Sequence, residues 1–218
     1  MISITRLPEP AKLIEKKEQW LATYLKKRET KPGSRPDSRQ YGHPKIRNDL
    51  RAMSADKCFY CEHKLAESED QVDHYIEVAE KPELAFDWDN LYLSCHACNS
   101  KKLPNTTIPV SDCLNPCDPS ENPADHLAFE GEYIVSRVGS SKGSATIQKY
   151  RLSRPGLDQL RGRELRLFTE LVLELRERQR RDGKPPTQSE KEQLASFKEP
   201  QHPYSLMFSM YLARHELL

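Results

Sequence analysis

The spacing of four cysteines constrains this chain more than any other feature of its sequence. Cys58 and Cys61 form one Cys-x-x-Cys pair, and after thirty-three residues Cys95 and Cys98 form a second. Two such pairs present four thiolates to one tetrahedral zinc ion, and a shell filled by four cysteines leaves no position for a substrate. The spacing therefore predicts a structural zinc site, and folding of the segment around it depends on the metal.

Free thiols or a redox Cys-x-x-Cys are the alternative interpretations of these cysteines. A redox motif does not need a second matched pair, so the repeated spacing favours metal binding. The two remaining cysteines, Cys113 and Cys117, have a looser spacing and no matching pair. Free or packed thiols are the simpler interpretation for them, and we assign them no role.

The composition is that of a polar, loop-rich globular protein. Of 218 residues, 36% are hydrophobic, 31% are charged and 16 are prolines. No apolar run reaches the length of about 18 residues that suggests a membrane span. The segment MISITRLPEP lacks the charged-then-apolar order of a signal peptide. We therefore expect a cytoplasmic location without membrane contact, in which cysteines stay reduced.

The distribution of charge says more than the net charge of +1. Residues 26–51 contain nine basic and three acidic side chains, whereas residues 62–89 contain ten acidic and two basic ones. Such blocks are either solvated faces or a basic arm beside an acidic, cation-binding centre.

Apolar periodicity and turn residues predict helices on both sides of the cysteine-rich segment. The expected elements are a helix over 8–29, an irregular basic loop over 31–44, a helix over 43–53, a hairpin over 127–138, a long helix from Pro155 to just before Gly183 with Ser153 as its cap, and helices over 189–198 and 203–218. This pattern divides the chain into an N-terminal helical segment with a basic loop (1–54), a zinc-stapled core and extension (55–138) and a C-terminal helical region (139–218).

Between the cysteine pairs the pattern reads strand, strand, helix. Residues 72–76 and 91–93 have the composition of short strands, and a helix opens at Cys98. Successive side chains of a strand point to opposite faces, so Asp73 and His74 share one site only where the backbone is irregular, and we expect an irregularity there. On the helix, neighbours diverge by about 100°, so Asn99 turns away from the zinc and toward the strands.

This arrangement resembles the HNH, or ββα-metal, endonucleases in the variant stapled by a four-cysteine zinc. The resemblance implies an α+β fold with a ββα core flanked by N- and C-terminal helices. It also implies that Asp73 and Asn99 hold a divalent ion, that His74 is the general base and that Asn90 positions the loop bearing His74. These roles suit the residues, because a neutral imidazole accepts a proton from water and Mg²⁺ or Mn²⁺ prefers oxygen ligands.

A wider resemblance covers most of the chain. The runs AFDWDNLYLSCHACNSKK, PVSDCLNPCDPSENPADHLAFEG and TIQKYRLSRPGLDQLRGREL are similar to the PtuB-type HNH subunits of Septu anti-phage systems and of related retron effectors. That family implies an ABC-type ATPase as the partner subunit. The segment YIEVAEKPEL departs from the aromatic-basic-proline pattern expected after the histidine.

The expected substrate is nucleic acid, with DNA favoured. Lys101 and Lys102 follow Asn99 on a helix and suit phosphate contact, which makes them the substrate-binding candidates. Weaker candidates lie in and after the basic loop: Arg35, Arg39, Lys45 and Arg47. Two alternatives stay open, an RNA nuclease that acts on a target such as tRNA and a non-catalytic zinc module that binds nucleic acid or protein.

Overall fold

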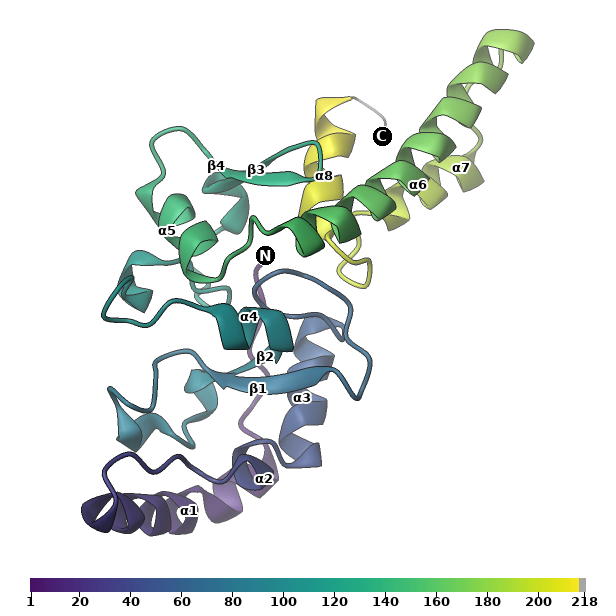
Figure 1. Ribbon diagram of the computed structural model, residues 1–218. Helices are drawn as coiled ribbons and strands as arrows, with labels where there is room; N and C mark the ends of the chain where they lie inside the picture. The colour runs from purple at the N-terminus through teal and green to yellow at the C-terminus, as the bar shows by residue number, and fades with distance from the viewer. Residues whose placement is uncertain (216–218) are drawn as a thin grey trace.

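Two small antiparallel sheets and a series of helices make up the computed structural model, which describes residues 1–215. Figure 1 shows them stacked along one direction. The N-terminal helices lie at one end, the first sheet and α4 lie at the centre, and the second sheet lies beyond them beside α5 and α8. The predicted α+β class is confirmed, as is the order strand, strand, helix between the cysteine pairs.

The helices and strands have the following bounds. In chain order they are α1 (Ala11–Thr30), α2 (Ser38–Tyr41), α3 (Pro44–Ser54), β1 (Asp70–His74), β2 (Leu91–Cys95), α4 (His96–Lys101), β3 (Leu127–Glu130), β4 (Tyr133–Ser136), α5 (Ser141–Lys149), α6 (Pro155–Asp182), α7 (Gln188–Ser196) and α8 (Ser205–Arg214).

The N-terminal region contains one helix more than expected. The short helix α2 interrupts the predicted irregular loop, and the carboxylate of Asp37 caps it by accepting a hydrogen bond from the backbone of Arg39 at 2.9 Å. The next helix, α3, begins with Pro44 at its first position, where a proline costs no hydrogen bond. It ends at Ser54, the next residue Ala55 adopts the left-handed conformation, and the chain continues into the first cysteine pair.

The central sheet is regular where an irregularity was expected. Val72 pairs with Leu93 and His74 pairs with Leu91, so the antiparallel register continues unbroken through Asp73. The expected irregularity at Asp73 and His74 is therefore wrong. The chain bends one residue later, at Tyr75, and side chains from both faces of the strand end border the same cavity.

The predicted hairpin is present as β3 and β4, but the following helix α5 was not expected. Its sequence SKGSATIQK has few apolar residues and a glycine, Gly143, in its first turn. The hydroxyl of Ser140 caps this helix by accepting a hydrogen bond from the Gly143 backbone at 2.9 Å. The helix packs closely, because a Cβ atom at Gly143 would lie 2.2 Å from the carbonyl oxygen of His126.

The C-terminal region follows the predicted helices with one correction. The long helix α6 begins at Pro155 and ends before Gly183, which adopts the left-handed conformation at φ 65°. Ser153 does not cap it, since the residue at the cap is Arg154 and no side chain accepts a hydrogen bond there. The last predicted helix is α8, and residues 216–218 of that prediction lie outside the described residues.

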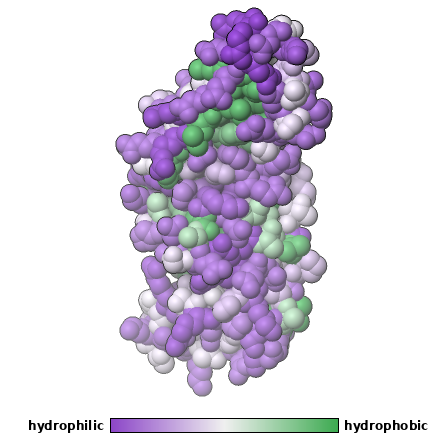
Figure 2. Space-filling view, turned by 90° about the vertical axis from the view of Figure 1, so that its right-hand side faces the viewer, coloured by the Kyte–Doolittle hydropathy of each residue, from purple (hydrophilic) through white to green (hydrophobic). Residues whose placement is uncertain are grey.

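Exposed hydrophobic side chains gather on α6. Leu167 and Leu173 are 56% and 47% exposed, and Figure 2 shows hydrophobic side chains in the upper part of the face on which α6 lies.

Within residues 1–215, no helix is both long enough and apolar enough to cross a membrane.

Candidate metal centre and active site

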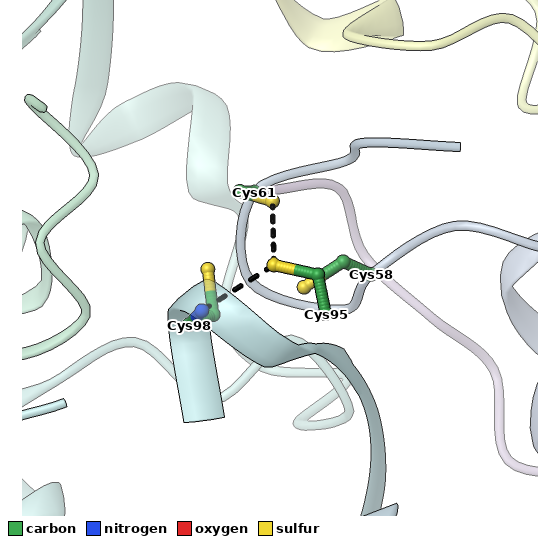
Figure 3. A group of neighbouring side chains, drawn as sticks. All are labelled: Cys58, Cys61, Cys95 and Cys98. Carbon is green, nitrogen blue, oxygen red and sulfur yellow. Dashed lines mark hydrogen bonds between the residues drawn. The ribbon is translucent and has the colours of Figure 1, made fainter. Parts of the chain in front are cut away.

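The sulfur atoms of the four paired cysteines converge on one point. They all lie within 4.8 Å of one another, and Sγ of Cys61 is 3.9 Å from Sγ of Cys95 (Figure 3). A tetrahedral zinc ion with Zn–S bonds of about 2.3 Å requires sulfurs about 3.8 Å apart. The buried, sulfur-only donor set fits that ion, and the four cysteines are positioned to bind a metal.

Local backbone geometry brings each pair into place. In the first pair, the backbone of Glu62 donates to the carbonyl oxygen of Cys58 at 2.9 Å, and Glu62 itself adopts a left-handed φ of 62°. In the second pair, Cys95 ends β2 and caps α4, and its sulfur accepts a hydrogen bond from the backbone of Cys98 at 3.3 Å. A turn and a helix start thus hold the four thiols rigidly.

A guanidinium from the C-terminal region touches the cysteine cluster. Nη2 of Arg154 lies 3.5 Å from Sγ of Cys98 and 3.9 Å from Sγ of Cys95. The same side chain donates to the carbonyl oxygen of Arg151 at 2.8 Å, which fixes its direction. Hydrogen bonding, chiefly from Cys58, lowers the pKa of Cys61 to about 7. Hydrogen bonding from the neighbouring thiols also lowers the pKa of Cys95, whereas the pKa values of Cys58 and Cys98 are raised. Arg154 supplies a positive charge beside this cluster.

The cysteines outside the cluster have no such surroundings. Burial raises the pKa of Cys113 to about 11 and also raises the pKa of Cys117. In the part of the chain that the structure describes, the four-cysteine group is the one set of three or more His, Cys, Asp or Glu side chains placed to share an ion.

A second site lies beside the end of β1, in a cavity of about 460 Å³. The side chains predicted from the sequence that border it are Asp73, His74, Asn99 and Lys102, and the N-terminal region contributes Arg28, Arg35 and Tyr41. Strand β1, helix α4 and the loop before α2 therefore form the walls of one polar cavity.

The imidazole of His74 is held in one tautomer. Its Nε2 lies 2.9 Å from the carbonyl oxygen of Ala85, and because a carbonyl can only accept, Nε2 carries the proton and Nδ1 keeps its lone pair. The ring of Tyr41 packs edge-on against it, with centroids 4.7 Å apart. Burial lowers the pKa of His74 below its ordinary value. The ring is therefore neutral at neutral pH and able to accept a proton.

Asn90 fixes the segment that follows His74. Its Oδ1 accepts a hydrogen bond from the backbone of Ile76 at 2.7 Å, and its Nδ2 donates to the carbonyl oxygens of Ile76 and Leu84 at 3.0 and 3.1 Å. The side chain is buried and joins two backbone segments next to the imidazole. This geometry suits the positioning role that the sequence predicts for Asn90.

Asp73 already binds a cation of the chain. Nζ of Lys102 lies 2.6 and 2.8 Å from the two carboxylate oxygens of Asp73, and it also donates to the carbonyl oxygen of His74 at 2.9 Å. Asn99 faces the same cavity and donates to Gln71 through Nδ2 at 2.9 Å. One carboxylate and one amide oxygen suit Mg²⁺ or Mn²⁺, and the position of Lys102 shows that a positive charge is accommodated there.

The residues predicted to contact the substrate lie in different places. Lys102 is directed at Asp73 and its side chain is 12% exposed, whereas Lys101 is exposed and borders another hollow beside His96 and Arg154. Among the weaker candidates, Arg35 borders the cavity of His74. Arg39 and Arg47 instead form ion pairs with acidic residues, Asp37 and Asp70 respectively.

Sequence reasoning missed three side chains that contact the two sites. They are Arg154 at the cysteine cluster, Tyr41 against His74 and Tyr60, whose hydroxyl donates to Asp73 at 2.9 Å. Tyr41 and Arg154 lie outside the cysteine-bounded segment, and no spacing rule connects them to it. Tyr60 lies between two metal-binding cysteines, where an aromatic residue reads as ordinary packing.

The family model for HNH endonucleases matches residues 58–104, which span both cysteine pairs and the residues between them. The chain therefore contains an HNH endonuclease domain, as its sequence predicts. The chain is also 28% identical over 162 residues to the Septu protein PtuB of Bacillus thuringiensis, with 73% of this chain and 57% of the relative covered.

A Septu protein PtuB of Bacillus mycoides (strain KBAB4) is 28% identical over an aligned length of 155, and the match covers 56% of this chain and 52% of that protein. The chain thus spans a little over half the length of these curated relatives.

Proposed function

We propose that this protein is a metal-dependent endonuclease that hydrolyses phosphodiester bonds in nucleic acid. The observation that carries the proposal is the meeting of Asp73, His74 and Asn99 in one polar cavity of an HNH domain. These side chains supply a general base and two oxygen ligands, which are the groups needed for metal-assisted hydrolysis.

His74 performs the proton transfer in this proposal. Nδ1 takes a proton from the attacking water, while the bond from Nε2 to the carbonyl of Ala85 holds the ring in place. Asn90 keeps the following segment from moving, so the imidazole is preorganised. A Mg²⁺ or Mn²⁺ ion held by Asp73 and Asn99 would stabilise the negative charge on the leaving oxygen.

The four-cysteine site has a different role. We assign it to a structural zinc ion, because all four ligand positions are filled by thiols and none is open to a substrate. Cys95 ends the strand that pairs with β1, and Cys98 precedes Asn99 on α4. Zinc at this point would hold α4, which carries Asn99, and β2, which pairs with the strand that carries Asp73 and His74.

The similarity to Septu PtuB proteins supports a role in anti-phage defence. The family resemblance of the sequence implies an ABC-type ATPase as the partner. DNA is the favoured substrate, and Arg35 at the rim of the cavity and Lys101 on α4 are candidates for phosphate contact. RNA is the alternative substrate, because a nucleophile derived from water does not require a 2′-hydroxyl.

The test incubates the purified protein, alone and with its ATPase partner, with supercoiled plasmid and with total RNA in Mg²⁺ or Mn²⁺. We expect the wild type to nick the plasmid, His74→Ala to be inactive and His215→Ala, a control at an exposed histidine, to keep activity. Cleavage of RNA alone would establish the alternative substrate. Binding without strand scission in any condition would exclude the nuclease in favour of a non-catalytic zinc module.

A further inference from the structure

A tyrosine between the first two cysteines reaches the proposed active site. Tyr60 is fully buried, and its hydroxyl donates a hydrogen bond of 2.9 Å to Oδ2 of Asp73. Its sequence neighbours include Cys61, whose sulfur belongs to the four-cysteine cluster. The turn from Cys58 to Glu62 therefore contributes to the four-cysteine site and also contacts the carboxylate assigned to the divalent ion.

The phenol ring has little freedom to choose another partner. It stacks on Tyr150 with centroids 4.0 Å apart and planes inclined by 15°, and Tyr92 lies parallel on the same cluster at 6.1 Å. The backbone beside it is fixed too, because Phe59 donates to the carbonyl oxygen of Leu93 at 2.9 Å. Stacked rings and a paired backbone aim the hydroxyl in a single direction.

We infer that Tyr60 is a positioning residue of the reaction, one that fixes the rotation of the Asp73 carboxylate. The hydroxyl holds Oδ2 in the orientation in which both carboxylate oxygens face the ammonium of Lys102, the position of positive charge in the cavity. Without that bond the carboxylate of Asp73 rotates more freely. A metal ion must then restrict this rotation when it binds, which lowers the affinity for the ion. Partners that hydrogen-bond to a ligand in this way typically contribute 10- to 100-fold to metal affinity.

This inference rests on the proposed function, since it assigns Asp73 to the divalent ion. It adds that the turn containing the cysteines sets the geometry of the catalytic site through one hydroxyl. The zinc and the hydrolytic ion would then be coupled through Tyr60, in addition to sharing the β1–β2 sheet.

The test compares Tyr60→Phe with Tyr92→Phe in the full, zinc-loaded chain. Both substitutions remove a buried hydroxyl from the same ring cluster, but the hydroxyl of Tyr92 donates to Asn115, away from the cavity. Zinc content and melting temperature establish that both variants fold. Mn²⁺ binding is then measured by electron paramagnetic resonance, and cleavage is measured over a range of Mn²⁺ concentrations.

We expect Tyr60→Phe to bind Mn²⁺ about tenfold more weakly than Tyr92→Phe. The Mn²⁺ concentration for half-maximal cleavage should rise equally, and excess ion should restore most of the rate, which a merely structural defect would not allow. Equal Mn²⁺ affinity in the two variants, with an active wild type, overturns the inference and leaves the nuclease standing. A wild type that neither binds Mn²⁺ nor cleaves overturns both.

Discussion

The ammonium of Lys102 lies on the carboxylate of Asp73, where the sequence predicts a divalent ion. A lysine beside a carboxylate lowers the negative charge available to a metal and competes for the same oxygens. Lys102 is three residues after Asn99 and directly follows α4, so the end of this helix brings together a proposed metal ligand and a competing cation. The role of Lys102 in substrate binding remains a prediction. Its contact with Asp73 adds a second predicted role, in which Lys102 competes with a metal ion for the carboxylate oxygens.

Lys102→Met should therefore bind Mn²⁺ more tightly than the wild type. Removing the ammonium leaves both oxygens of Asp73 without their charged partner, and we expect a gain of several-fold to tenfold in affinity. Isothermal titration of the zinc-loaded protein measures it, with Lys101→Met as the matched control because Lys101 borders a different hollow. Unchanged or weaker binding in Lys102→Met would contradict competition.

The pH dependence of cleavage should reflect the lowered pKa of His74. Burial disfavours the charged imidazolium, and a cation at Asp73 acts in the same direction. The base is deprotonated above its pKa, so activity should fall only as the pH drops below the ordinary histidine value of about 6.5. A profile of kcat/KM between pH 4.5 and 8 checks this, and a half-maximal point above 6.5 would contradict it.

The elements predicted correctly are those with strong periodicity or a matched motif. The two cysteine pairs bracket the segment in which β1, β2 and α4 were predicted, and the stripe of leucines predicted the extent of α6. The short helices α2 and α5 were missed because their stability comes from caps and from packing on other segments, which periodicity does not reveal. The irregularity expected at Asp73 is absent. It was expected because neighbouring side chains of a strand point to opposite faces and cannot share a site above one face of the sheet. The cavity instead lies at the end of the strand, where side chains from both faces border it.

Alanine substitutions at two glycines, one in α5 and a control in α6, test how closely α5 is packed. Gly143→Ala should destabilise the protein by about 1–3 kcal/mol or more, because the new methyl would lie 2.2 Å from the His126 carbonyl oxygen. Gly156→Ala, in the first turn of α6, meets nothing within 4 Å and should be neutral or up to about 1 kcal/mol stabilising. Urea denaturation of both variants measures the difference, and similar stabilities would refute the close contact.

At the scale of the whole molecule, residues from both ends of the chain surround the HNH domain. Arg35 and Tyr41 come from the N-terminal side of the matched segment and border the cavity of His74, while Tyr150 and Arg154 come from the C-terminal side. The division into 1–54, 55–138 and 139–218 remains a prediction, and contacts between these parts complete both sites. Sequence spacing locates the ligands, but only the folded chain shows what surrounds them.

Arg154→Gln should weaken zinc retention. The guanidinium offsets the negative charge of the thiolates and hydrogen-bonds to two of them, and removal of such a partner typically costs at least tenfold in metal affinity. Competition with a chromogenic zinc chelator measures the release, with Arg163→Gln, an exposed position of the following helix α6, as control. Identical release from the two variants would show that Arg154 does not stabilise the site.

Helix α6 begins at the residue that follows Arg154 and runs for 28 residues. At about 1.5 Å per residue it is about 42 Å long, and Figure 1 shows its far half projecting from the body of the fold with α7 beside it. Arg154 touches Cys95 and Cys98 immediately before the helix starts. A shift of the start of α6 on binding of another molecule would therefore move this positive charge against the cysteine cluster.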